Sequence, residues 1–172
     1  YPNTAAAFNV QAGVTYYFQA GRIFSGSGDV HLDLQELQQP ANDNFADAEI
    51  ITSLPFNGSV DSTRATIELG ESSFCGSTPQ TQSVWYSITP ATNMVVRADM
   101  AGSSFSDTNL TIFQAVGSGI GGLSFLNVAC FGGSVTFNIA AGTTYYLQAA
   151  SYSSGGGDLH LNLQMVPPPA ND

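Results

Sequence analysis

Residues 141–172 read AGTTYYLQAASYSSGGGDLHLNLQMVPPPAND, and almost the same sequence occurs earlier in the chain. Residues 12–43 read AGVTYYFQAGRIFSGSGDVHLDLQELQQPAND, and 19 of the 32 aligned positions are identical without a gap. The two copies begin at residues 12 and 141, so the period is 129 residues. Self-similarity at a fixed period predicts tandem structural repeats.

The repeat predicts how the chain is divided. Residues 1–39 correspond to the C-terminal part of a preceding repeat, residues 40–168 to one complete repeat, and residues 169–172 to the start of the next. Proline-rich runs at 38–40 and 167–169 mark the boundaries, and we expect them to act as short, stiff linkers.

Apolar residues alternate with polar ones inside each copy. Leu159, Leu161 and Leu163 alternate with polar side chains, and Val30–Leu34 repeats the pattern in the first copy. A period of two predicts strands with one buried face. Further strands are expected at 49–52, 55–60, 66–69, 83–89, 94–100, 109–116, 123–129, 135–139 and 143–149, with one helical turn at 45–49 capped by Asn44.

About nine short strands separated by Gly- and Ser-rich turns predict an all-β fold. We expect an antiparallel, jelly-roll-like β-sandwich in each repeat.

Composition narrows the class of protein. Only 9% of the 172 residues are charged, lysine is absent, and 13 acidic residues against 3 basic ones give a net charge of −10. With no basic stripe to neutralise phosphates, nucleic acid is not an expected partner. No apolar run is long enough to span a membrane, and the low charge is typical of extracellular β proteins. We therefore expect a secreted or cell-surface protein.

The two cysteines, Cys75 and Cys130, both lie in the complete repeat. An even pair in a secreted domain favours a disulfide, and two buried thiols are the alternative. The preceding copy does not share the pair, because Tyr1 stands at the position of Cys130.

Motifs that would carry chemistry have plainer interpretations. The glycines at 117–122 spell G-x-G-x-x-G, but a strand follows where a dinucleotide site needs a helix, so a hairpin loop is predicted. His31 and His160 occupy the same repeat position on the polar phase of a strand, which predicts exposed side chains and not a catalytic or zinc pair. We expect no enzymatic activity.

Two glycosylation sequons begin at Asn57 and Asn109. Such triplets are common by chance. Each asparagine is therefore either glycosylated on the surface or left unmodified.

The order of motifs resembles a known family. PANDNFADAEII (40–51), SVWYSITP (83–90), FSDTNLTIFQAVG (105–117) and the ending AGTTYYLQAASYSSGGGDLHLNLQ (141–164) together resemble the bacterial pre-peptidase C-terminal-like domain. The resemblance covers residues 40–166 and the partial copy at 8–39. It implies a jelly-roll-like sandwich that serves as a non-catalytic module of secreted proteases or large surface proteins. The sequence departs from the family at 106–108, where a more acidic D-x-D is usual.

The same resemblance implies a calcium site. In the related collagen-binding modules of bacterial collagenases, an Asn-Asp at the linker joins acidic residues of the first strands to chelate calcium, which nominates Asn42, Asp43 and Asp61 here. The alternative is that Asn42 and Asp43 bond the backbone and shape the linker turn. We expect no other cofactor.

Three functions fit these observations. The first is a structural repeat of a surface fibre, stalk or filament whose partners are neighbouring copies, with strand sharing between neighbours as a variant. The second is an adhesin or carbohydrate- or protein-binding module, and the third is an accessory domain of a secreted protease. Adjacent aromatic residues are the candidates for a binding platform: Tyr16, Tyr17, Trp85, Tyr86, Tyr145 and Tyr146.

Overall fold

The computed structural model describes residues 10–11, 13–21, 28–36, 38–75, 80–152 and 155–167. The chain separates into two units, residues 1–36 and residues 37–172. The predicted start of a third repeat at 169–172 lies outside the described residues. Among the described residues, no helix is long and apolar enough to cross a membrane.

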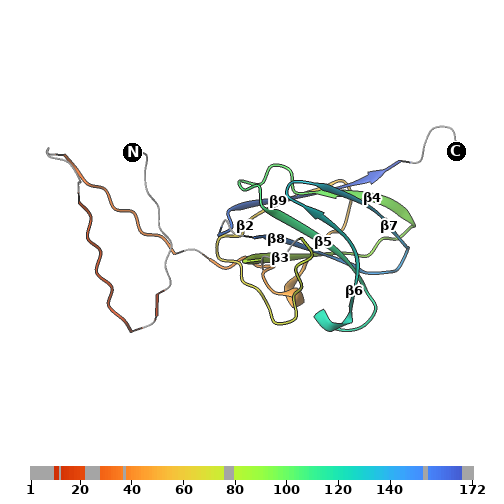
Figure 1. The fold of residues 1–172 in the computed structure, drawn as a ribbon, viewed down its shortest axis with the longest axis horizontal. Helices are drawn as coiled ribbons and strands as arrows, with labels where there is room; N and C mark the ends of the chain where they lie inside the picture. Colours follow the sequence, from red (N-terminus) through yellow and green to blue (C-terminus); the bar gives the residue numbers. More distant parts are fainter. Residues whose placement is uncertain are drawn as a thin grey trace. The chain divides into compact units, whose positions relative to one another are not determined.

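The second unit is an all-β structure of two sheets, as predicted (Figure 1). One sheet has five strands in the order β1-β3-β8-β5-β6, and the other has four in the order β2-β9-β4-β7. The strands are β1 (Glu49–Ile50), β2 (Phe56–Asp61), β3 (Gln82–Ile88), β4 (Met94–Asp99), β5 (Thr108–Ala115), β6 (Leu123–Cys130), β7 (Ser134–Ile139), β8 (Tyr145–Ser151) and β9 (Asp158–Val166).

The pairing is antiparallel except between β1 and β3, which run parallel. The strands of the C-terminal repeat motif take central places. β8 lies between β3 and β5, and β9 lies between β2 and β4. The sequence 141–172 therefore supplies the middle of both sheets.

The core between the sheets follows from the alternation of apolar residues. β7 shows the pattern most simply, with Val135, Phe137 and Ile139 buried and the residues between them exposed. The side chains of this core come from both sheets and include Val84, Tyr86, Val96, Leu110, Ile112, Leu147 and Leu161. Burying such residues is the main favourable contribution to the stability of the repeat.

The three central strands of the five-stranded sheet, β3, β8 and β5, are buried on both faces. Nearly every residue of β3, β5 and β8 is buried, including polar side chains that alternate with the core residues, such as Ser83, Asn109 and Gln148. These side chains bond the loop between β2 and β3, whose described residues are 62–75 and 80–81. Thr66, Glu71 and Gln80 of this loop lie over the outer face of the sheet. The candidate functional site lies under this loop.

Three local predictions were tested by the structure. Residues 66–69 were expected to form a strand, but they lie in this loop. The helical turn exists as a 3-10 helix, η1 (Phe45–Asp47), but Asn44 does not cap it, because its amide bonds the Asp47 side chain instead. The glycines at 117–122 connect β5 to β6 through a second 3-10 turn, η2 (Ile120–Gly122), as expected of a hairpin loop. There the backbone of Gly117 would meet a Cβ on Gly122 at 2.3 Å, so only glycine fits.

The first unit looks different at equivalent positions. No strand is assigned to its described residues, 10–11, 13–21 and 28–36, so the predicted strand at Val30–Leu34 is wrong for this structure. Val30, Leu32 and Leu34 are 53%, 55% and 61% exposed, whereas the equivalent residues of β9 are at most 1% exposed. Apolar alternation alone does not make a strand where no neighbouring strand covers it.

Candidate functional site

The Asn-Asp pair after the Pro-rich boundary is docked onto the five-stranded sheet. Asn42 pairs with the backbone of Trp85 in both directions: its carbonyl accepts from the Trp85 N–H at 2.8 Å, and its side-chain amide donates to the Trp85 carbonyl at 3.1 Å. Asn42 thereby continues the sheet edge beyond β1, which explains why an asparagine at this position is buried.

Asp43 has a different set of partners and is 1% exposed. Its carboxylate accepts the Thr66 N–H at 2.6 Å, the Thr66 hydroxyl at 2.8 Å and the Gln39 side-chain amide at 2.6 Å. These donors join the boundary segment to the β2–β3 loop. Three hydrogen bonds offset the cost of burying the carboxylate.

Glu71 is the centre of the contacts beneath the loop. Its Oε1 accepts from the indole Nε1–H of Trp85 at 3.1 Å and from the Glu68 N–H at 3.2 Å. Its Oε2 accepts from the Gln148 amide at 2.7 Å, the Ser83 hydroxyl at 2.7 Å and the Gln80 amide at 3.2 Å. We call Glu71 and these five donors the Glu71 cluster.

The five donors of the Glu71 cluster use the hydrogen-bonding capacity of the Glu71 carboxylate. Two carboxylate oxygens offer about four lone-pair directions, and five donors use all of them. Glu71 therefore fixes the loop to β3 and β8 and has no lone pair free for an incoming ligand. The side chain of Gln148 is oriented by its bond to Glu71, which leaves its Oε1 buried without a hydrogen-bond partner among the described residues.

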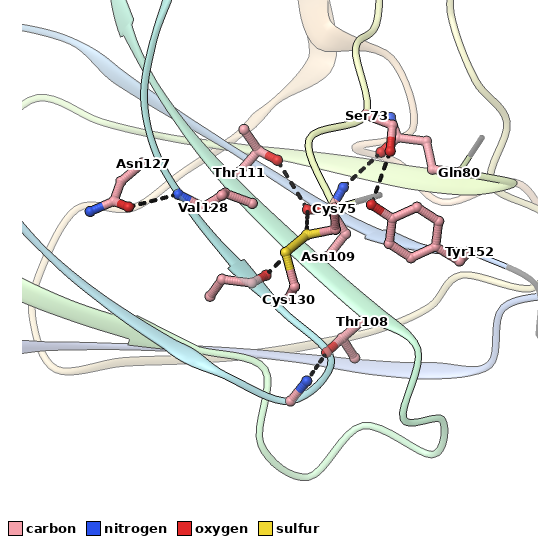
Figure 2. The surroundings of a disulfide bond; sticks show 12 residues. Ser73, Cys75, Gln80, Thr108, Asn109, Thr111, Asn127, Val128, Cys130 and Tyr152 are labelled. Carbon is pink, nitrogen blue, oxygen red and sulfur yellow. Dashed lines mark hydrogen bonds between the residues drawn. A yellow bond between two sulfur atoms is a disulfide. The ribbon is translucent and has the colours of Figure 1, made fainter. Parts of the chain in front are cut away.

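The predicted disulfide is confirmed. Cys75, in the β2–β3 loop, is bonded to Cys130 at the end of β6 (Figure 2). The bridge spans 55 positions of sequence and crosses from the loop to the edge of the five-stranded sheet. The disulfide thus fixes the β2–β3 loop at Cys75, and the hydrogen bonds of Glu71 fix the same loop four residues earlier.

Polar groups surround the bridge. The sulfur of Cys75 lies 3.1 Å from Oδ1 of Asn109, and the same oxygen accepts the Thr111 hydroxyl at 3.1 Å (Figure 2). The amide nitrogen of Asn109 donates to Gln80 at 3.1 Å. Both polar atoms of the Asn109 side chain are therefore bonded, and the bond to Gln80 holds the loop on β5.

An aromatic cavity opens beside the Glu71 cluster. It has a volume of about 120 Å³, and its walls include Glu71, Trp85, Phe113 and the stacked rings of Phe74 and Phe125. The two stacked rings have centroids 4.4 Å apart and are 39% and 46% exposed, whereas Trp85 and Phe113 are buried. Ligand sites usually enclose at least about 300 Å³, so this cavity fits a single side chain or the edge of one ring.

One tyrosine of the core has an unusual environment. Burial raises the pKa of Tyr86 to about 12. The nearby Asn42 side chain lowers this pKa, and the negative charge of Glu49 raises it further. The hydroxyl of Tyr86 is buried without a hydrogen-bond partner among the described residues. Its ring packs edge-on against Phe56, with 5.8 Å between centroids.

The structure does not place the three residues nominated for calcium together: Asn42 and Asp43 precede the first strand, and Asp61 is the last residue of β2. Asn42 bonds β3 and Asp43 bonds Thr66, whereas Asp61 lies in the other sheet. Hydrogen bonds from the Thr63 side chain and from the Thr63 N–H, the latter at 2.9 Å, lower the pKa of Asp61. Within the described residues, no three His, Cys, Asp or Glu side chains form a group suited to a metal ion. Calcium binding stays a prediction, and Asp43 would have to exchange its present donors for the ion.

The two sequons lie in opposite environments. Asn57 is exposed on β2, so a glycan there is sterically allowed. Asn109 is 0% exposed and bonded under the loop, so the fold leaves no room for a glycan on it. The prediction at Asn109 does not fit the folded repeat.

The aromatic platform proposed from adjacent aromatic residues does not exist in the second unit. Trp85, Tyr86 and Tyr145 are buried, and Tyr146 packs on Phe45 with 4.5 Å between ring centroids. Among the described residues of the second unit, the exposed aromatic side chains are Phe74, Phe125 and Phe131, which sequence reasoning had not singled out. In the first unit, the predicted platform residues Tyr16 and Tyr17 are exposed. His160 is half-buried on β9 and His31 is exposed.

Sequence reasoning also missed Glu71. Its partners come from residues 68, 80, 83, 85 and 148, and only the last shares a motif with the earlier copy. No local spacing signals a cluster assembled from three separate parts of the chain.

No protein family model matches the chain, and no curated protein is significantly similar to it. Among solved structures, a periplasmic inhibitor of g-type lysozyme from Aeromonas hydrophila, PliG, aligns with a TM-score of 0.43 and 14% identity, over 69% of this chain and 96% of the inhibitor. A GH26-CBM35 β-(1,4)-mannanase from Podospora anserina aligns with a TM-score of 0.30 and 11% identity, over 65% of this chain. The aligned region is 28% of the mannanase.

Proposed function

We propose that the chain is part of a secreted bacterial surface fibre, stalk or extracellular filament, in which each repeat is a non-catalytic structural bead joined to the next by a Pro-rich boundary. The chain is then a divergent relative of the pre-peptidase C-terminal-like modules that its motifs resemble. Its partners are neighbouring copies of the same repeat.

One observation carries this proposal. Several residues that are identical in the two copies build the bead and its boundary. Tyr145, Leu161 and Leu163 lie in the core, Gln148 belongs to the Glu71 cluster, and each has an identical counterpart 129 residues earlier. The boundary residues Asn42 and Asp43 have the same sequence again at 171–172. Repetition of scaffold residues is what an array of stacked beads requires.

The disulfide supports the proposed location. Disulfides form and persist in oxidising compartments outside the cytoplasm, and this bridge fixes a surface loop. The low charge and the absence of lysine agree with a protein exposed to the exterior.

Imaging of the native assembly by electron microscopy tests the proposal. A fibre whose axial spacing equals one bead, or a small multiple of it, is the expected result. Dispersed monomers would contradict a filament, and mass spectrometry of the intact polypeptide would show whether a protease domain is attached instead. Treatment with reductant gives a second readout, since beads that lose the bridge should melt at lower temperature within an otherwise similar fibre.

The exposed pair Phe74 and Phe125 favours one other candidate, a binding module. Paired exposed rings beside a cavity are typical of an interaction surface. Binding of glycans that is lost in Phe125→Ala and retained in Phe131→Ala, an exposed aromatic outside that cavity, would favour this candidate over the fibre.

A further inference from the structure

A row of aromatic rings borders the cavity beside the Glu71 cluster. Trp85 lies next to Phe113, with 6.0 Å between ring centroids, and Phe113 meets Phe74 edge-on with 5.9 Å between centroids. Phe74 in turn stacks on Phe125. All four rings line the cavity, so much of its wall is aromatic.

Glu71 supplies the charge of this cavity. Among the described residues that line it, Glu71 is the only one with a charged side chain, and the others are aromatic, aliphatic, glycine or serine. The protein as a whole carries a net charge of −10. The cavity therefore combines aromatic rings with a negative potential, which favours a cation over a neutral or anionic ligand.

The hydrogen bonds of Glu71 restrict the kind of cation. Its carboxylate already accepts from five neutral donors, one of them the Trp85 N–H, so its charge acts on the cavity while its lone pairs are used. The remaining polar side chain among the described lining residues is that of Ser72. A lysine ammonium brings three N–H donors and an arginine guanidinium five, and these would lack acceptors here. A quaternary ammonium group has no N–H and leaves no donor unsatisfied.

The size and accessibility of the cavity agree with such a group. A volume of about 120 Å³ is small for a whole ligand but suits one trimethylammonium group, which has the size of a tert-butyl group. Phe74 and Phe125 are partly exposed, so a cation can reach them from solvent. Phe74 is followed by Cys75, whose bridge to Cys130 fixes that side of the cavity. A fixed cavity binds with a smaller loss of conformational entropy.

We propose that the cavity formed by Trp85, Phe113, Phe74, Phe125 and Glu71 binds the quaternary ammonium group of a small, free organic cation such as choline. The aromatic rings attract the cation, and the Glu71 carboxylate balances its charge without a hydrogen bond. Zwitterionic phosphocholine is a poorer ligand, because a protein of net charge −10 repels its phosphate. The site goes beyond the proposed function, since it does not depend on whether the repeats form a fibre.

Binding can be measured on the 172-residue chain through the fluorescence of Trp85, its one tryptophan, and by ligand-observed NMR. Choline is compared with its uncharged isostere dimethylbutanol, in which carbon replaces the nitrogen. We expect choline to bind about three- to thirtyfold more tightly than the alcohol. Ethanolamine, the primary-amine analogue of choline, should bind more weakly than choline. Sodium chloride should weaken the binding of choline and leave that of the alcohol unchanged.

Phe125→Leu separates the contribution of the aromatic ring from that of apolar contact. Leucine keeps an apolar side chain but has no ring, so choline should bind about two- to fivefold more weakly while dimethylbutanol binds as before. Phe131→Leu is the matched control. It changes an exposed ring outside the cavity lining and should alter neither affinity.

Several results would overturn the inference. They are equal affinities of the wild type for choline and dimethylbutanol, a preference for ethanolamine or phosphocholine over choline, and an affinity for choline that Phe125→Leu leaves unchanged. Absence of choline binding in both the fluorescence and the NMR measurement would overturn it as well. Filament imaging is independent of these measurements, so a failure of the fibre proposal would be recognised separately.

Discussion

The carboxylate of Glu71 accepts the indole Nε1–H of Trp85 at 3.1 Å, and this contact connects a surface loop to the middle of the buried strand β3. The five donors of the Glu71 cluster are all neutral groups of the described residues. The outer face of the five-stranded sheet thus has a small polar core of its own, separate from the apolar core between the sheets. Its integrity determines whether the loop remains in place.

Glu71→Gln tests the importance of this cluster. The substitution keeps the shape but turns one acceptor into a donor, so buried donors lose their partner. We expect the free energy of unfolding to fall by about 3 kcal/mol. Urea unfolding followed through the fluorescence of Trp85, the one tryptophan of the chain, gives the measurement. Glu49→Gln, at an exposed position, serves as the control and should change stability by less than about 0.5 kcal/mol. Equal stabilities of the two variants would contradict the role assigned to Glu71.

The strands were predictable because their signal is local. In β7, and in β9 as far as Leu163, every second residue is apolar, and the structure buries those residues. The assignment failed at 66–69, where an apolar–polar pattern exists but the backbone bonds a side chain: the Thr66 N–H donates to Asp43. Strand propensity is a property of the local sequence, whereas the bond between Thr66 and Asp43 joins residues more than twenty positions apart.

The candidate site was predictable only in part for the same reason. Cys75 and Cys130 could be paired because the chain has two cysteines and therefore one possible bridge. Asn109 could not be recognised as buried from its sequon, since the loop that covers it is fixed by Gln80 and the disulfide. Tertiary contacts, and not sequence motifs, decided which polar residues are accessible.

Removing the disulfide should destabilise the repeat. A cross-link over 55 positions restricts the unfolded chain, and the loop-entropy relation gives about 4 kcal/mol for it. The double variant Cys75→Ala, Cys130→Ala should therefore melt at lower temperature than the oxidised protein. Reductant should lower the melting temperature of the wild type toward that of the double variant and leave the variant unchanged. A wild type that does not respond to reductant, despite complete reduction shown by thiol labelling, would argue against this contribution.

Tyr86 should make the repeat sensitive to alkaline pH. Its pKa is about 12 in the folded protein, against an ordinary value of 10.0 that applies to the unfolded chain. Between these two values the unfolded chain loses a proton that the folded protein keeps. Stability should accordingly fall as pH rises through this window, by about 1.4 kcal/mol per pH unit for this group. Tyr86→Phe should remove that part of the slope, and it should cost little at neutral pH because the hydroxyl has no hydrogen-bond partner among the described residues.

Phe56→Leu provides the control for the alkaline experiment. It removes the ring that packs on Tyr86 but keeps the hydroxyl. This variant should be less stable at every pH with the alkaline slope unchanged. If Tyr86→Phe and the wild type lose stability in parallel above about pH 10, the slope does not arise from Tyr86.

Asp43 should prove structural whether or not calcium binds. A double-mutant cycle of Asp43→Ala and Thr66→Val, measured by urea unfolding in chelator, should give a coupling of about 1–3 kcal/mol, because the hydroxyl bond is removed by either change. Thr63→Val is a suitable control, since Thr63 contacts Asp61 and not Asp43. Adding calcium to the chelator-treated wild type then separates the two interpretations. An ion at Asn42, Asp43 and Asp61 would raise the melting temperature and weaken the coupling as it displaces the threonine, whereas an unchanged melting temperature would assign this carboxylate to docking the boundary segment.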